Sequence, residues 1–89
     1  MNLNFKAETV TKSGIVPCVA PYINFLNQTD KTQVIKVSGV SFNLDTGDSM
    51  SFPHSGINPL VFVNNSFDVV YTAPTNGREL IVTRGYFID

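Results

Sequence analysis

Residues 60–88 read LVFVNNSFDVVYTAPTNGRELIVTRGYFI, three runs rich in Val, Ile, Phe and Tyr with turn residues between them. The runs span residues 60–64, 66–73 and 79–88, and the breaks are Asn64-Asn65 and Pro74-Thr75-Asn76-Gly77. Short β-branched and aromatic runs bounded by Asn, Gly and Pro are typical of antiparallel strands. Asn76-Gly77 is the strongest hairpin signal in the chain, because both residues tolerate the positive φ angles of a type I′ turn.

The first third of the chain has a similar rhythm. Residues 3–10 begin with apolar and polar residues in alternation, which predicts a strand with one buried face. Residues 15–27 are interrupted by Pro17 and Pro21. Since proline cannot donate to a strand ladder, this stretch is expected to form an edge strand or two short pieces around a bend. The terminal runs, 3–10 and 79–88, are the other candidates for edge strands.

The longest strand candidate, residues 32–44, changes its apolar face at Ser38-Gly39. A β-bulge at that point would insert the one residue needed to keep both apolar sets directed at the core. The alternative is a strand that is buried on both faces. The Asp45-Thr46-Gly47-Asp48 sequence that follows predicts a tight turn, and residues 53–59 form the main irregular loop.

These runs predict an all-β fold: a single antiparallel β-sandwich domain, residues 1–89, of about seven to eight short strands. Its topology is expected to be a jelly roll or an immunoglobulin-like Greek key, and a small closed barrel is the next possibility. The chain has no Trp and one Cys, so it lacks the Cys…Trp…Cys pattern of true immunoglobulin domains. This difference favours the jelly roll.

The composition points away from several classes of function. Charged residues make up 15% of the chain, against the roughly 25% that is usual in soluble domains. A surface with so few charges is easier to explain inside an assembly than on a lone monomer. The six Lys and Arg are scattered singly and the net charge is −1, so no basic stripe for nucleic acid is evident. No apolar run approaches the ~20 residues of a membrane helix.

No catalytic or metal-binding pattern stands out, and we expect neither enzymatic activity nor a cofactor. The single His54 lies beside Ser55 in an irregular loop, and one His and one Cys are too few for a zinc site. Asp45 and Asp48 fit a β-turn better than a calcium site, because no Glu follows at EF-hand spacing. Cys18 is expected to be a buried small hydrophobe. Three tyrosines, expected at the rim of the core rather than as platforms for sugar rings, are Tyr22, Tyr71 and Tyr86.

Asn27 and Asn64 begin N-glycosylation sequons, but the N-terminal residues do not resemble a secretory signal. The sequons are therefore expected to be coincidental in an Asn-rich chain. We expect a protein made and retained in a reducing cytoplasm, or released by lysis.

Three stretches resemble small β-sandwich proteins of tailed and tailless bacteriophages: residues 70–83, VYTAPTNGRELIVT; residues 82–88, VTRGYFI; and residues 24–29 leading into residues 34–42. In those proteins a strand ends in Thr-Ala-Pro or Val-Pro, and a Gly-containing turn, a basic residue and an apolar strand follow. In many of them this phrase opens the domain, whereas here it comes near the end. The resemblance implies a virion structural role, such as a decoration, cement, penton, spike or head–tail component.

The leading hypothesis is therefore a non-enzymatic virion protein whose partners are copies of itself and other virion proteins, without nucleic acid or membrane insertion. One alternative is a module that binds a receptor or glycan, and another is a small inhibitor of a host protein. Candidate interface residues come from the irregular loop and are Pro53, His54, Ser55, Ile57, Asn58 and Pro59.

Overall fold

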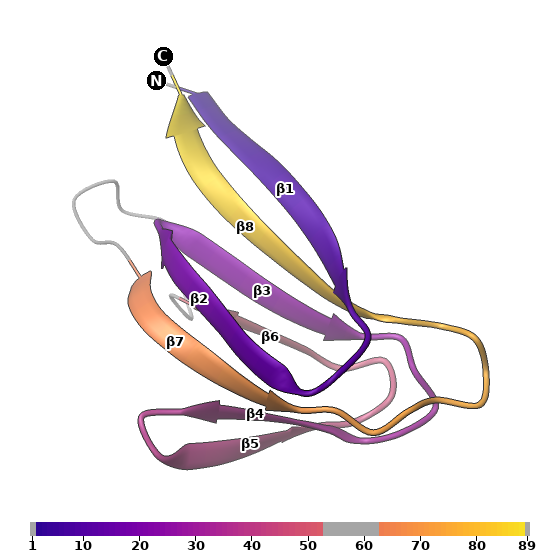
Figure 1. The fold of residues 1–89 in the computed structure, drawn as a ribbon. Coiled ribbons are helices and arrows are strands. Elements are labelled where there is room, and N and C mark those ends of the chain that lie inside the picture. Colours follow the sequence, from indigo (N-terminus) through magenta and orange to yellow (C-terminus); the bar gives the residue numbers. More distant parts are fainter. Residues whose placement is uncertain (1, 53–62, 89) are drawn as a thin grey trace.

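The computed structural model describes residues 2–52 and 63–88, which form eight antiparallel strands and no helix (Figure 1). The strands are β1 (Asn2–Val10), β2 (Gly14–Ala20), β3 (Tyr22–Asn27), β4 (Gln33–Val37), β5 (Val40–Leu44), β6 (Ser49–Phe52), β7 (Val63–Val70) and β8 (Leu80–Ile88). They make two four-stranded sheets, sheet A with the order β1-β8-β3-β6 and sheet B with the order β2-β7-β4-β5. The all-β class and the two-sheet sandwich predicted from the sequence are confirmed.

The strand pairs are nested: β1 pairs with β8, β2 with β7, β3 with β6, and β4 with β5. The chain therefore folds as one long hairpin whose tip lies between β4 and β5, and this hairpin is wrapped into two sheets. Additional pairs, β3 with β8 and β4 with β7, close each sheet. This nesting is the strand order of an eight-stranded jelly roll.

The tip of the long hairpin lies at Ser38-Gly39, where the sequence predicted a β-bulge in one continuous strand. That prediction is wrong: both residues have positive φ, 50° and 80°, and they form a two-residue turn between β4 and β5. Val37 lies directly opposite Val40, and Ile35 opposite Phe42. Both apolar sets do share one face, as the pattern required, but a reversal of the chain brings them together rather than an inserted residue.

Two other predictions about turns are also wrong. Asn64-Asn65 does not break the chain, because β7 continues through it to Val70. Asn76-Gly77 does not form a hairpin, because the strands on either side of it belong to different sheets. Gly77 has a φ of 71°, but Asn76 does not adopt the positive φ that a type I′ turn requires. Residues 71–79 instead form a loop that carries the chain from sheet B to sheet A.

The proline-interrupted stretch behaves as predicted. It forms two pieces, β2 at the edge of sheet B and β3 inside sheet A, with the buried Pro21 at the corner between them. Among the terminal strands, β1 is an edge strand as expected. The same expectation for residues 79–88 is wrong, because β8 lies between β1 and β3.

The core lies between the sheets and is built around aromatic rings. Phe67 of β7 has its ring centroid 5.2 Å from that of Phe25 and 5.3 Å from that of Phe52, so it joins the two layers. Full burial of one such side chain stabilises a fold by about 1.5–3 kcal/mol. The other fully or nearly buried apolar residues are Val16, Cys18, Ala20, Ile23, Ile35, Leu44, Val69, Leu80 and Val82.

A buried polar cluster holds the loops together at one end of the sandwich. Asn27, Thr29 and Gln33 are all 0% exposed. The Asn27 amide nitrogen donates to the carbonyls of Lys31 and Leu44, each at 2.8 Å. Gln33 donates to the carbonyl of Thr72 and accepts from its N–H, both at 2.8 Å. The cluster thus connects the loops after β3, β5 and β7, and among the described residues every buried side-chain polar atom has a partner.

Candidate functional site

The interface predicted from the irregular loop, Pro53, His54, Ser55, Ile57, Asn58 and Pro59, lies outside the residues that the structure describes. Those six residues stay a prediction. The described residues offer two other features of interest, the edge strand β1 and a polar cleft beside it.

Strand β1 is nine residues long and forms the outer edge of sheet A (Figure 1). Within residues 2–52 and 63–88 its only strand neighbour is β8, so one side of its backbone ladder is open. The side chains of residues 4–9 are all exposed. A long edge strand presents N–H and C=O groups that can pair with another chain.

The two faces of β1 differ in chemistry. Phe5 lies in one row with Gly85 of β8 and Tyr22 of β3, on the outer face of sheet A. Glu8 lies in the row of Val82 and the buried Phe25, and thus on the face toward the other sheet. Phe5, Ala7 and Thr9 therefore point outward, whereas Lys6 and Glu8 point inward. Lys6 and Glu8 remain exposed even so, which means that the described residues leave their part of the inner face uncovered.

The outer face of sheet A is uncharged at its described positions. The Phe5 ring meets the Tyr22 ring edge to face, with centroids 5.9 Å apart, and Phe5 is 51% exposed. The Tyr22 hydroxyl lies 3.2 Å from Ser51 Oγ, which donates to Asn24. The described side chains that share this face are Phe5, Ala7, Thr9, Tyr22, Asn24, Leu26, Ser49, Ser51, Ile81 and Thr83.

The side chain of Arg84, in β8, reaches from sheet A to sheet B. Its Nε and Nη2 atoms donate to the carbonyl of Pro17 at 3.3 and 2.8 Å, and its Nη1 atom contacts the carboxylate of Glu8. The Arg84 side chain is 14% exposed and that of Glu8 55%. Arg84 therefore ties sheet A to the edge strand β2 of sheet B. It also lies near Cys18, whose thiol pKa is raised by burial and lowered to a lesser degree by the arginine charge.

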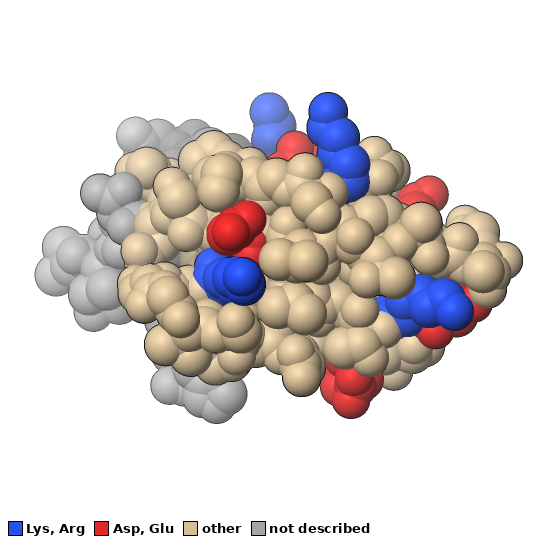
Figure 2. All heavy atoms as spheres, turned by 60° about the horizontal axis from the view of Figure 1, so that its bottom comes forward, with Lys and Arg blue, Asp and Glu red and all other residues tan. Residues whose placement is uncertain are grey.

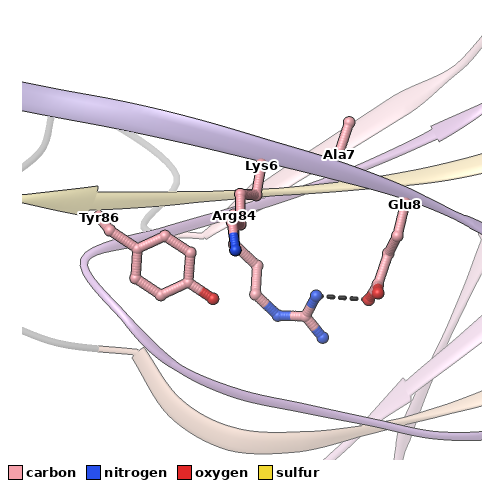
Figure 3. A pocket seen from close by; sticks show the side chains of 5 residues that line it. All are labelled: Lys6, Ala7, Glu8, Arg84 and Tyr86. Atoms are coloured by element: carbon pink, nitrogen blue, oxygen red, sulfur yellow. Dashed lines mark hydrogen bonds and ion pairs between the residues drawn. The ribbon is translucent and has the colours of Figure 1, made fainter.

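A cleft of about 370 Å³ opens beside this contact, lined by Lys6, Ala7, Glu8, Arg84 and Tyr86. Figure 3 shows Arg84 running from β8 toward Glu8, with the Tyr86 ring beside it. The cleft thus combines two cations, one carboxylate and one phenol. No prediction from the sequence included it, because Lys6 and Glu8 meet Arg84 and Tyr86 only through the β1–β8 register. The signal available was their spacing: each pair lies two residues apart and so on one face of its strand.

Most of the remaining predictions about single described residues are confirmed. Cys18 is free and 2% exposed, as expected for a buried small hydrophobe. The prediction that the tyrosines lie at the rim of the core is confirmed for Tyr71 and Tyr86, which pack against it. It is wrong for Tyr22, which lies half-buried on the outer face of sheet A. Asp45 to Asp48 form a turn closed by a 3.0 Å hydrogen bond from Asp48 N to Asp45 O, with Gly47 at a φ of 85°.

Two further findings concern the part of the chain that the structure describes. No three His, Cys, Asp or Glu residues there come together as metal ligands, and no helix there could span a bilayer. Figure 2 shows one face of the molecule, which is mostly uncharged; two of its Lys and Arg side chains stand close together at the top edge and the others lie singly. That face has no basic stripe of the kind that follows a phosphate backbone.

Comparisons with known proteins do not assign the chain to a family: no family model, no curated protein and no solved structure matches it. The surfaces of the chain itself, its edge strand β1 and the cleft beside it, therefore carry what can be proposed about its function.

Proposed function

We propose that this protein is a non-enzymatic structural subunit of a virus or bacteriophage particle and that it acts by protein–protein assembly. The observation that carries the proposal is strand β1, a nine-residue edge whose side chains at residues 4–9 are exposed and whose ladder has no second neighbour among the described strands. Natural proteins usually protect such edges with short strands, prolines, charged side chains, bulges or coverings, since an open edge invites pairing with other chains.

The other edges illustrate this contrast. Strand β2 carries Pro17, and the carbonyl of that proline already accepts hydrogen bonds from Arg84. Strands β5 and β6 have five and four residues. Strand β1 contains no proline and is the longest of the four edge strands that the structure describes. Strand β1 is therefore a long edge without a proline, and its inward-pointing charges, Lys6 and Glu8, restrict pairing to a strand that matches them.

The outer face of sheet A supports the same role. Its described positions carry apolar and neutral side chains only, and its exposed large apolar side chain, Phe5, lies on the edge strand itself. Centres of protein interfaces are depleted in charged residues and enriched in aromatic ones. Strand pairing along β1 would extend this uncharged face into a neighbouring subunit.

The virion setting rests on two further arguments. Residues 70–83 and 82–88 resemble small bacteriophage β-sandwich proteins, and eight-stranded jelly rolls are common in capsid domains. A fold of this kind also occurs in lectins, so the fold alone does not assign the function. The partners proposed are copies of this chain and other virion proteins, in particles assembled in the host cytoplasm.

The test has two parts. Light scattering of the purified chain should show a multimer, or a monomer that adds to purified shells. Quantitative analysis of purified particles should find the chain in a fixed ratio to the main shell protein. A monomer that neither self-associates nor adds to shells, and that is missing from particles, would overturn the proposal.

The cleft favours one second candidate, a module that binds a glycan or receptor. Its Tyr86 ring and its charged groups could contact a small polar ligand. A glycan array probed with the intact protein tests this candidate. Specific retention that is lost in Tyr86→Ala and kept in Tyr71→Ala would favour it over assembly.

A further inference from the structure

We infer that the partner of strand β1 is a second copy of the same strand, paired antiparallel about a two-fold axis that passes beside Ala7. This inference rests on the proposed assembly function and names the partner. Its starting observation is the inner face of β1, where Lys6 and Glu8 lie two residues apart, exposed and with opposite charge.

The positions of these two charges select the register. When two copies of one strand pair antiparallel and keep their inner faces on the same side of the sheet, one residue of each copy lies directly opposite the same residue of the other copy. The two-fold axis passes between these two equivalent residues. An axis at Lys6 would place two lysines opposite each other, and an axis at Glu8 would do the same with two glutamates. An axis at Ala7 places Lys6 of each copy opposite Glu8 of the other. Opposite charges in directly facing positions stabilise a sheet, and like charges destabilise it.

The outer face fits the same register. Ala7 would face Ala7 of the second copy, and Phe5 would face Thr9. The small alanines at the centre place no bulk at the axis, and each phenylalanine, 51% exposed in the single chain, would lie against a partner residue. The two uncharged outer faces would join into one continuous surface across an eight-stranded sheet.

The contact of Glu8 with Arg84 leaves room for this pairing. The Glu8 side chain is 55% exposed even while Arg84 holds one of its oxygens, so its carboxylate can accept a second cation. The ammonium of Lys6 from the second copy would arrive from the open side of the strand, away from β8. Residues 4–10 of each copy would then pair. Because such an interface is small, we expect a dimer whose population depends on concentration.

Disulfide trapping tests the register directly, in the full chain under mild oxidation. With the axis at Ala7, the Ala7→Cys variant should form a disulfide-linked dimer, because facing Cα atoms in paired strands lie within disulfide range. Thr9→Cys is the matched control: it lies on the same face, but its two copies would be separated by four residues along the strand, about 13 Å. It should not cross-link alone, but it should cross-link to Phe5→Cys when the two variants are mixed. The unmodified chain, whose Cys18 is buried, gives the background level of cross-linking.

A charge change tests the stabilising pair. Lys6→Glu would place a carboxylate opposite Glu8 twice per dimer. It should therefore raise the dissociation constant of the dimer about tenfold or more. Lys31→Glu makes the same charge change on an exposed loop residue outside β1 and should leave association unchanged. Circular dichroism and melting of each variant show whether it is folded.

Failure of this inference is distinguishable from failure of the proposed function. If Ala7→Cys stays monomeric while the folded chain still adds to shells, the second copy is not the partner of β1 but the assembly role stands. If Thr9→Cys cross-links and Ala7→Cys does not, the register is wrong. If the chain neither cross-links nor adds to shells, both are overturned.

Discussion

The hydroxyl of Thr29 lies 2.6 Å from Oδ1 of Asn27, and both side chains are completely buried. The backbone N–H of Thr29 donates to the same oxygen at 2.9 Å. These two residues also form the Asn-x-Thr pattern of a glycosylation sequon. The structure gives the pattern a different meaning: Asn and Thr stand two apart here because they bond to each other and close the loop after β3.

Because of these hydrogen bonds, we expect Asn27→Ala to lower the stability of the fold substantially. The substitution removes the two donors to the carbonyls of Lys31 and Leu44 and leaves polar groups buried without partners. We expect the free energy of unfolding to fall by about 2–4 kcal/mol, since each unsatisfied buried group costs about 1–3 kcal/mol. Urea denaturation measures it. Asn43→Ala, on the exposed side of β5, is the control and should cost little. Equal midpoints for both variants would contradict the role of the cluster.

The turn between β4 and β5 predicts opposite outcomes at neighbouring positions. Gly39 has a φ of 80° with open space around its missing Cβ, so Gly39→Val is resisted by backbone conformation alone. The expected loss is about 1–2 kcal/mol, the cost of a left-handed conformation for a residue with a side chain. Ser38→Asn should be neutral or slightly stabilising, because asparagine tolerates the positive φ of 50° found at this position. Thermal melting of the two variants separates these outcomes, and an unchanged melting temperature in Gly39→Val would count against the turn.

The strand pattern of the sequence predicted the fold class because alternation and turn residues act locally. Which turn signals make hairpins could not be read in the same way. Ser38-Gly39 and Asn76-Gly77 are similar dipeptides, yet one is the tip of a hairpin and the other lies in a loop between sheets. Pairing partners far apart in the chain decide the difference. The same limit applies to the cleft, because Glu8 and Arg84 are 76 residues apart and meet only through the register of β1 and β8.

Burial of the Cys18 thiol predicts a dependence of stability on pH. Burial raises the pKa of this thiol above its ordinary value of 9.0, so the folded state holds the proton more tightly than the unfolded state. The contribution is therefore fully present below pH 9.0 and is lost as the pH rises through the folded-state pKa. Urea unfolding at several pH values should show a steeper decline above pH 9.0 in the natural chain than in Cys18→Ala, which lacks the titrating group. Parallel declines would mean that the thiol is not held neutral by the fold.

Arg84 binds two partners, the Pro17 carbonyl and the Glu8 carboxylate, and we expect the carbonyl to contribute more to stability. Its two bonds to the Pro17 carbonyl are made by a side chain that is 14% exposed, whereas the Glu8 carboxylate is 55% exposed and screened by water. Arg84→Met keeps the apolar stem but leaves the Pro17 carbonyl without its donors, so it should cost about 1.5–3 kcal/mol of unfolding free energy. Glu8→Gln should cost less than about 1 kcal/mol, the usual range for an exposed ion pair.

A double-mutant cycle with these two substitutions checks the assignment. The coupling between Arg84 and Glu8 should be small beside the total effect of Arg84→Met, because the main partner of the guanidinium is the backbone of β2. A coupling as large as the whole Arg84→Met effect would show instead that the ion pair holds the two sheets together. In that case Lys6→Glu, which places a carboxylate directly opposite Arg84, would be expected to stabilise the single chain while it weakens the dimer.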